Sequence, residues 1–385
     1  MEIKNLKRVS QRIKKAIRGK KNIILYGDAD LDGTSALLIL EEAIKNLGGK
    51  ITAVYFPDRE KEGYGINKKA LEFLREKAPA LLILVDCGIS NFDEIKMAKK
   101  IGFEVIVIDH HKILDKVPEA SIVVDPKQEG DNYPFKELCT AGIVYYLSRL
   151  LLGKKLEGLL DNSFLELTAL ATLADMMPEK EDNKTLIEKG LEALPNTYRP
   201  GLRAFLDVFD DKQMSMREKA FKIISCLSAG EVKEHLTDIY LILRENDIET
   251  ARIMVQDLVE KNRVKHELIN GIIEEIKKKV SNERKIIVFE GDENWPVALL
   301  GNVASKIQTI YKKPVFIYKK GKEESRGAVR VPKGIDSVEA MKNCANLLVT
   351  YGGHAPASGF SIKNENLLKF EDCLIKYFEN YEKKS

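Results

Sequence analysis

Acidic and imidazole side chains follow several apolar segments in the first half of the chain. They are Asp28, Asp30 and Asp32 after residues 22–26, Asp86 after 81–85, and Asp109, His110 and His111 after 104–108. A further candidate, Asp175, comes at the end of a longer apolar run. One acidic loop of this kind usually caps a helix or faces solvent, but three such loops on successive segments point to a shared site.

Several carboxylates held close together repel one another and keep their protons unless a cation balances them. Carboxylates combined with one or two imidazoles suit hard or borderline divalent ions such as Mn²⁺ or Mg²⁺. A pair of such ions can activate a water molecule and stabilise the leaving oxygen of a phosphoester. The acidic loops therefore predict a two-metal site for phosphoester hydrolysis.

Five apolar segments alternate with helical stretches and are expected to be strands. They are residues 22–26, 51–56, 81–85, 104–108 and 121–124. Continuous apolar strands separated by helices are typical of a parallel sheet covered on both faces. Ligands bind at the carboxyl ends of such strands. The pattern predicts a doubly wound α/β domain over residues 1–185, with the acidic side chains at its ligand-binding edge.

The rest of the chain is expected to form a linker and a second domain. Residues 186–282 are charge-rich with a helical pattern, and they end in a long amphipathic stretch. A smaller α/β domain is expected over residues 283–385, opening with the apolar segment 284–291. The predicted fold class is α/β, with two domains joined by a long helical linker.

Composition limits the kind of partner and the compartment. The 385-residue chain has a formal net charge of +3, so a nucleic-acid site would have to be a local basic patch. Two lysine-rich tracts, at 13–21 and 317–325, could contact the phosphates of a nucleic acid, although we expect them to be solvent-exposed surface segments.

The five cysteines form no CxxC pair, so we expect reduced thiols and neither a zinc site nor a disulfide. Without a signal core or a membrane-spanning run, a soluble cytoplasmic chain with no membrane partner is expected.

Taken together, the motifs resemble the DHH phosphoesterase superfamily. GDADLDG, VDCGIS, IDHHK and LADMMP look like its metal motifs, and YGGHAPASGF (351–360) looks like the signature of the DHH-associated substrate-binding domain. Further segments resemble the RecJ-like single-strand exonuclease branch: LCTAGIVYYL (138–147), RPGLRAFL (199–206), EKNR (260–263) and GNVASKI (301–307). The order and spacing of the set make the resemblance specific.

The resemblance implies two Mn²⁺ or Mg²⁺ ions per active site. One ion would be held by Asp28 and Asp30, the other by Asp32, His110 and Asp175, with Asp86 bridging both. His111 would contact the scissile phosphate or help to protonate the leaving group. Asp109 would orient an imidazole, and a buried helix cap is an equal alternative for it.

The resemblance also implies a phosphate grip in the second domain. The backbone amides of Gly352 and Gly353 would approach a phosphate, and His354 would donate to it. Arg330 matches a phosphate-binding arginine, whose planar fork suits that contact. For Arg326, an exposed surface position is an equal alternative.

Three features depart from the RecJ pattern. Residues 327–331 lack the two hydroxyl side chains that usually flank the arginine, and Glu231 stands where a basic residue usually grips a 5′ phosphate. The chain also ends soon after the DHH-associated domain, where bacterial RecJ enzymes continue into an oligonucleotide-binding barrel. These departures weaken the expectation of strict 5′-end recognition.

The leading hypothesis is a two-metal, RecJ-like exonuclease that hydrolyses single-stranded DNA or RNA to mononucleotides, with replication or repair proteins as candidate partners. A second hypothesis is a phosphodiesterase for short oligonucleotides or cyclic dinucleotides. A third, from another class, is a non-catalytic replication or repair scaffold, which would be expected to have lost metal ligands.

Overall fold

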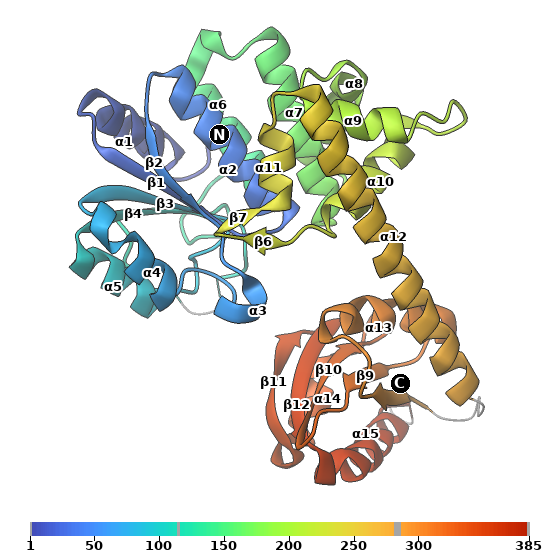
Figure 1. Cartoon of the computed structure of the whole chain (residues 1–385). Coiled ribbons are helices and arrows are strands. Elements are labelled where there is room, and N and C mark those ends of the chain that lie inside the picture. Colours follow the sequence, from blue (N-terminus) through green and yellow to red (C-terminus); the bar gives the residue numbers. More distant parts are fainter. Residues whose placement is uncertain (1, 114–115, 281–285, 383–385) are drawn as a thin grey trace. The chain divides into compact units, whose positions relative to one another are not determined.

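The computed structural model describes residues 2–113, 116–280 and 286–382, with the backbone alone for Glu60, His354 and Glu382. The chain divides into two compact units, Met1–Asn262 and Arg263–Ser385. Each unit has its own sheet and is described by itself (Figure 1).

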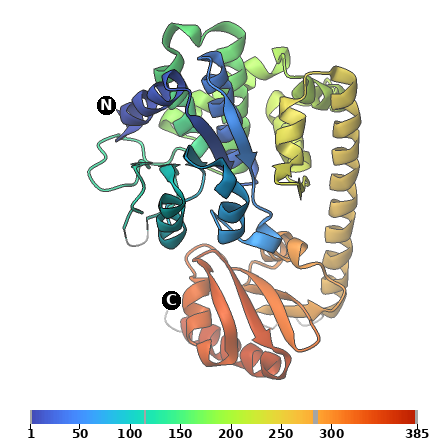
Figure 2. The same ribbon diagram turned by 60° about the vertical axis from the view of Figure 1, so that its left-hand side comes forward.

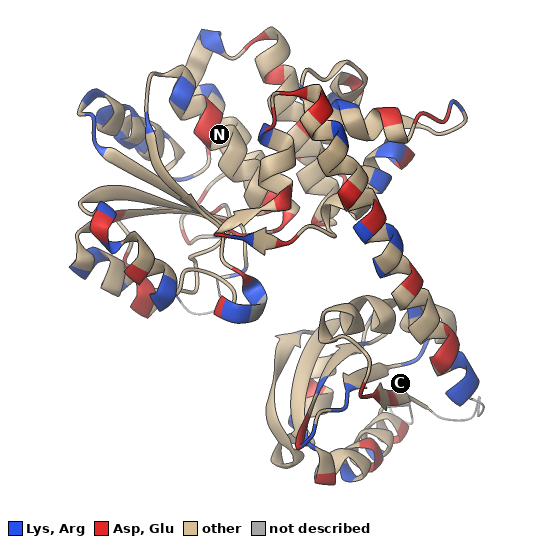
Figure 3. Ribbon diagram, viewed as in Figure 1, with Lys and Arg blue, Asp and Glu red and all other residues tan. Residues whose placement is uncertain are grey.

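The first unit is built on a five-stranded parallel sheet with the order β2-β1-β3-β4-β5. The strands are β1 (Asn22–Gly27), β2 (Ile51–Tyr55), β3 (Ala80–Val85), β4 (Phe103–Ile108) and β5 (Ile122–Val124). Figure 3 shows that these strands carry almost no charged residues. The parallel pairing confirms the predicted sheet. The strands other than the edge strand β2 are buried on both faces, which explains their continuous apolar segments.

Helices cover both faces of this sheet (Figures 1 and 2). One face packs against α1 (Leu6–Arg18), α2 (Leu31–Asn46) and α6 (Thr140–Leu152), and the other against α4 (Lys68–Leu74) and α5 (Phe92–Ile101). Alternate strand residues enter the two cores, since Leu25 lies in the first and Tyr26 in the second. The doubly wound arrangement is therefore confirmed.

A group of helices extends the first core beyond the sheet. It comprises α7 (Gly158–Ala174), α8 (Glu181–Ala193), α9 (Pro200–Val208), α10 (Met216–Leu227) and α11 (Asp238–Arg244), with a short hairpin of β6 (Val232–Lys233) and β7 (Leu236–Thr237). Arg199, almost fully buried, donates to both carboxylate oxygens of Glu42 at 2.9 Å. This bidentate pair joins the helical group to α2. Because the pair is largely buried, removal of one partner would leave the other as an uncompensated buried charge.

The long predicted helix is α12 (Ile248–Lys279), along which acidic and basic residues alternate (Figure 3). Its first part belongs to unit 1 and the rest to unit 2. The helical linker region is thus confirmed, while its predicted limits at residues 186 and 282 stay a prediction.

The second unit contains a mixed sheet with the order β11-β12-β10-β9-β8, parallel only between β8 and β9. The strands are β8 (Val288–Asp292), β9 (Val315–Lys319), β10 (Glu324–Arg330), β11 (Leu348–His354) and β12 (Ala357–Lys363). One face packs against α12 and α13 (Val297–Tyr311), the other against α14 (Ser337–Lys342) and α15 (Leu367–Glu382). Trp295 is buried in the first of these cores and donates to Glu275.

One expectation about the cysteines is wrong. Cys344, just after α14, forms a disulfide with Cys373 in α15, with their Cα atoms 6.1 Å apart. The packing of α14 against α15 makes this pair, so a scan for closely spaced cysteines does not find it. Cys87, Cys139 and Cys226 are free and buried, as reduced thiols would be. Among the described residues, no helix has the length and apolarity needed to cross a membrane.

A buried acid in the helical group makes stability depend on pH. Glu166 on α7 is 2% exposed, and burial raises its pKa to about 7 although Thr197 donates to it. Folded chains therefore hold a proton that unfolded chains lose between about pH 4.5 and 7, so this group lowers stability as pH rises through that window.

We expect Glu166→Gln to be more stable than the native chain at pH 8, by up to about 3 kcal/mol, and similar to it at pH 5. Urea unfolding at the two pH values measures this, with the exposed Glu188→Gln as the control variant. Identical pH dependence in the native chain and Glu166→Gln would contradict the assignment.

Candidate metal centre at the strand ends

Three neighbouring strands end at the same level of the first sheet. Gly27 of β1 pairs with Val85 of β3, and Val85 pairs with Ile108 of β4. The ladder continues one residue further, because the amide of Asp28 donates to Val85 and that of Asp86 donates to Ile108. The strand register therefore sets the acidic residues side by side.

The acidic loop after β1 folds directly into α2. Asp30 is the N-cap of this helix, and its Oδ1 accepts from the Gly33 amide at 3.0 Å. Asp32 lies in the first helical turn, where carboxylates are favourable. Gly33 is required at its position, since a Cβ there would lie 2.5 Å from the Asp28 carbonyl oxygen. The GDADLDG motif thus forms a tight turn that keeps its three carboxylates together.

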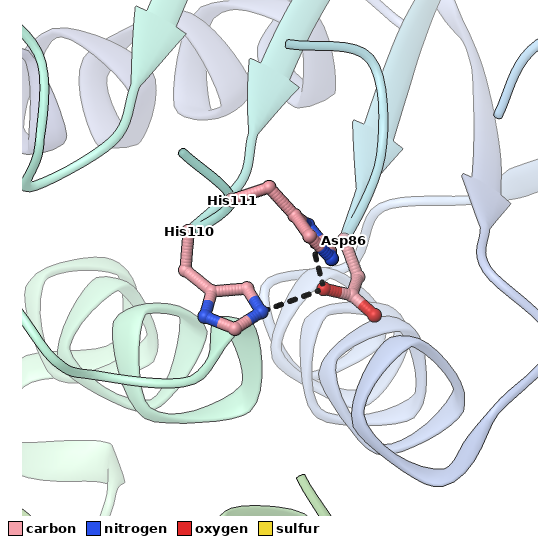
Figure 4. Close-up of side chains that lie close together, drawn as sticks. All are labelled: Asp86, His110 and His111. Atoms are coloured by element: carbon pink, nitrogen blue, oxygen red, sulfur yellow. Dashed lines mark ion pairs between the residues drawn. The ribbon is translucent and has the colours of Figure 1, made fainter. Parts of the chain in front are cut away.

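All six predicted metal ligands come together at this edge. Their ligand atoms form compact groups, each within 4.8 Å: Asp28, Asp30 and Asp86; Asp32, His110 and Asp175; and Asp86, His110 and His111. The His110 Nε2 atom lies 3.5 Å from Asp86 (Figure 4). It lies at the same distance from Asp175. Asp86 belongs to the first and third groups, and its Oδ1 lies 3.5 Å from His110 Nε2 of the second, so it lies between the two predicted ligand sets.

Asp86 is held in an unusual backbone conformation, with φ 61°. Non-glycine residues seldom adopt this region, and such residues gather at functional sites. Its Oδ1 accepts from the Thr140 hydroxyl at 2.9 Å. The Thr140 and Ala141 amides, at the start of α6, donate to the two oxygens of Asp32. The N-terminus of α6 therefore fixes two of the predicted ligands.

Crowding of buried carboxylates disturbs their protonation. Burial and neighbouring carboxylates raise the pKa of Asp32 to about 7 and the pKa of Asp175 to about 6. The same two causes raise the pKa of Asp86 well above its ordinary value. Burial lowers the pKa of His110 to about 3, so this imidazole is neutral, as a metal ligand must be. Such a group needs positive charge to stay ionised, and its oxygen and nitrogen donors fit Mn²⁺ or Mg²⁺.

Asp109 organises the histidine loop. It accepts from the amides of Ile89, His110 and His111, and it lies 2.8 Å from the Nδ1 atom of His111. Burial opposes its ionisation, but these hydrogen bonds and the charge of His111 prevail and lower its pKa. The same contact raises the pKa of His111 against the effect of burial. Asp109 is therefore a partner of an imidazole, as one interpretation predicted, and not a helix cap, because residues 109–113 form no helix.

Several contacts of the site were not foreseen. Arg59 pairs with Asp28 and Asp30, and the Tyr64 hydroxyl lies 3.0 Å from the Asp86 carbonyl oxygen and 3.2 Å from His111 Nδ1. Both come from the segment DREKEGYG, which has the composition of an exposed turn. Only the tertiary structure brings this segment to the metal ligands.

A further carboxylate, Asp125, follows the end of β5 and is fully buried. Burial raises its pKa to about 7, and it accepts from the Lys127 amide at 2.7 Å. The Lys127 ammonium donates to the His110 carbonyl oxygen at 2.6 Å. The strand-end pattern that singled out the other carboxylates could also have found this one, because 121–124 was itself an expected strand.

In the second unit, the predicted glycines lie on β11. Gly352 pairs with Gly359, and a Cβ on Gly352 would meet nothing within 4 Å. Gly353 has φ 139°, and a Cβ there would lie 2.6 Å from the Ala357 carbonyl oxygen, so only glycine fits. The strand ends at His354, whose side chain lies outside the described residues. The space beside the Gly352 backbone is therefore free for the close approach of another group.

Arg330 ends β10 and is partly buried, which lowers its pKa. Its Nη1 donates to the Val329 carbonyl oxygen, and among the described residues no carboxylate pairs with it. A Cβ on Gly301 of α13 would lie 3.2 Å from its Nη2, so the glycine leaves space for the guanidinium. Arg326, on the same strand, is exposed. Exposure agrees with the alternative that this residue is an ordinary surface arginine.

Two family models match the chain. Residues 22–172 match the DHH family, N-terminal domain, and residues 283–380 match the DHHA1 domain. The first match includes five of the six predicted metal ligands, all but Asp175, and the second includes the whole mixed sheet.

Curated relatives and a solved structure extend the match to nearly the full chain. The chain is 31% identical to the single-stranded-DNA-specific exonuclease RecJ of Bacillus subtilis (strain 168), covering 98% of this chain and 48% of that protein. It is also 31% identical to the RecJ of Thermus thermophilus, covering 94% and 53%. The crystal structure of an exonuclease RecJ bound to manganese is similar with a TM-score of 0.83 at 27% identity, covering 98% of this chain and 95% of that one.

The chain spans about half the length of these two curated relatives. Within that span, the parallel sheet, the helical linker region and the mixed sheet follow one another as in the manganese-bound structure. The chain therefore belongs to the DHH phosphoesterase family, carries a DHHA1 domain, and is RecJ-like along its whole length.

Proposed function

We propose that the chain is a two-metal phosphodiesterase that removes mononucleotides from single-stranded DNA or RNA. The observation that carries this proposal is the position of Asp86, which groups with Asp28 and Asp30 and also lies 3.5 Å from His110 of the other predicted ligand set. None of the predicted ligands is missing from those groups, which argues against a scaffold that has lost its chemistry. The manganese-bound RecJ structure supports the choice of manganese.

Asp28, Asp30 and Asp86 would hold one ion, and Asp32, His110 and Asp175 would hold the other together with Asp86. When bound, the ions would supply an activated water and offset the negative charge of the phosphate. The chain itself prepares this site, because the strand register and the α6 N-terminus fix the carboxylates before any ion arrives.

His111 is suited to donate a proton or a hydrogen bond. A carboxylate only accepts, so the contact with Asp109 places a proton on His111 Nδ1. Asp109 also favours the charged imidazolium, as the raised pKa of His111 shows. A protonated imidazole beside Asp86 would stabilise the phosphate charge or protonate the departing oxygen.

The second unit would bind a phosphate of the substrate. No carboxylate in the described part of the chain pairs with Arg330, and a Cβ on Gly352 would meet nothing within 4 Å, so another group could approach its backbone closely. A partly buried guanidinium without a carboxylate is an unusual arrangement, and a bidentate phosphate contact would satisfy it.

A preference for short oligonucleotides or dinucleotides is the second candidate, and Glu231 favours it. This side chain lies at the protein surface, 3.6 Å from Lys233, where the RecJ pattern has a basic residue for the 5′ phosphate. A carboxylate there would repel a terminal phosphate and weaken the grip on the strand end.

Product analysis on 5′- and 3′-labelled single strands of graded length tests the function, with DNA and RNA and with Mn²⁺ present. We expect mononucleotides from single strands and no cleavage of blunt duplexes. A steep preference for dimers would select the second candidate. Absence of cleavage at every length, with a folded and metal-bound protein, would contradict both.

Arg330→Ala should raise KM for oligonucleotides about tenfold or more, because hydrogen bonds to a charged phosphate are lost, while kcat changes less. Steady-state kinetics on a single-stranded oligonucleotide measure both constants. Arg326→Ala is the matched control on the same strand, and we expect its KM to stay near the native value. An unchanged KM for Arg330→Ala would rule out the phosphate contact.

A further inference from the structure

Arg59 occupies the carboxylates that would hold one of the metal ions. Its Nε donates to Asp28 Oδ1 at 2.8 Å, its Nη2 also contacts Asp28 Oδ2, and Nη2 donates to Asp30 Oδ2 at 2.9 Å. Among the described residues, it is the only lysine or arginine that pairs with any of the predicted metal-binding carboxylates. The guanidinium therefore stands where positive charge is needed most.

This contact has a clear electrostatic cause. The Asp28 carboxylate is fully buried, and an isolated buried carboxylate is costly without a cation. Asp30 and Asp86 add further negative charge beside it. Arg59 relieves that repulsion in the metal-free chain, so its pairing stabilises the arrangement of ligands before an ion binds.

A metal ion and Arg59 compete for these oxygens. Divalent ions in such sites bind carboxylate oxygens at about 2.0–2.2 Å, and Arg59 already contacts both oxygens of Asp28 and one of Asp30. Two cations on the same oxygens also repel each other. An ion bound at this position therefore favours movement of the guanidinium away from Asp28 and Asp30.

The segment that carries Arg59 is short and lies outside the sheet. Arg59 begins α3 (Arg59–Glu62), a single helical turn followed by Gly63 and Gly65, both with positive φ. The side chain of Arg59 is 45% exposed, and its guanidinium lies 5.6 Å from the centre of the exposed Tyr64 ring. Solvent is therefore open to the guanidinium once it leaves Asp28.

We propose that Arg59 is a displaceable counter-ion. It neutralises Asp28 and Asp30 in the metal-free chain, gives way when an ion binds, and then contacts a substrate phosphate next to the metal centre. A guanidinium released beside the site has the charge and the planar donor geometry for that contact. The first step concerns the metal alone, and only the last step rests on the proposed function.

Titration of the full chain with Mn²⁺ in a calorimeter tests the first step. Arg59→Ala should bind Mn²⁺ at least about fivefold more tightly at one of its sites, because a competing cation is gone. Arg59→Lys should lie between the native chain and Arg59→Ala. The control is Arg75→Ala, which removes an exposed arginine that pairs with Glu72 on the surface, and its affinity should not change.

Thermal unfolding gives a second readout that needs no substrate. Metal-free Arg59→Ala should melt below the native chain, and Mn²⁺ should raise its melting temperature by more than it raises that of the native chain. Unchanged or weaker Mn²⁺ binding by a folded Arg59→Ala would overturn the counter-ion role, and weaker binding would mean that Arg59 orients the ligands instead.

Kinetics on single-stranded oligonucleotides test the last step. With saturating Mn²⁺, Arg59→Ala should raise KM at least about fivefold, and an unchanged KM would overturn the phosphate contact. Should the native chain cleave no nucleic acid, the proposed function and this last step would both fall. The calorimetric result would still decide the counter-ion role by itself.

Discussion

Repulsion among buried carboxylates is the constraint on which the rest of the site depends. Asp32, Asp86 and Asp175 all have raised pKa values because burial and like charge act together on them. A fold that did not need this cluster would disperse it, since buried charges without partners oppose folding. The chain instead holds the cluster in place with strand register, the amides of α6 and the guanidinium of Arg59.

The surrounding fold explains how a small set of backbone features can hold so much charge. Each acidic loop leaves its strand at the same level, so no loop has to cross the sheet to reach its neighbours. Both faces of the sheet are covered by apolar packing, which makes the strand ends rigid. Ligands positioned by rigid elements need little reorganisation when an ion binds, and this is how a preorganised centre differs from a loose acidic patch.

Much of the fold could be predicted from the sequence because its signals are local. All five strands of the first sheet lie within one residue of their expected limits, since each is a continuous apolar segment bounded by polar residues. Five of the six predicted metal ligands were singled out for the same reason, as they come soon after those segments, whereas Asp175 follows helix α7. The order of the strands was not predicted, because it is decided by how distant helices pack.

Contacts between distant segments were the part that could not be foreseen. Arg59 reaches Asp28 from a turn whose composition suggests only solvent exposure, and Thr140 meets Asp86 across 54 positions of sequence. The disulfide between Cys344 and Cys373 has the same origin, as it depends on the packing of two helices. Each of these pairs forms through tertiary structure, and no spacing rule connects its members.

The central claim is that one carboxylate, Asp86, serves two metal ions. Calorimetric titration with Mn²⁺ tests it most directly, comparing the native chain with Asp86→Asn and with the exposed control Asp93→Asn. We predict two bound ions for the native chain and the control, and weakened binding at both sites in Asp86→Asn. Loss of only one site, or two native-like sites in Asp86→Asn, would contradict a shared ligand.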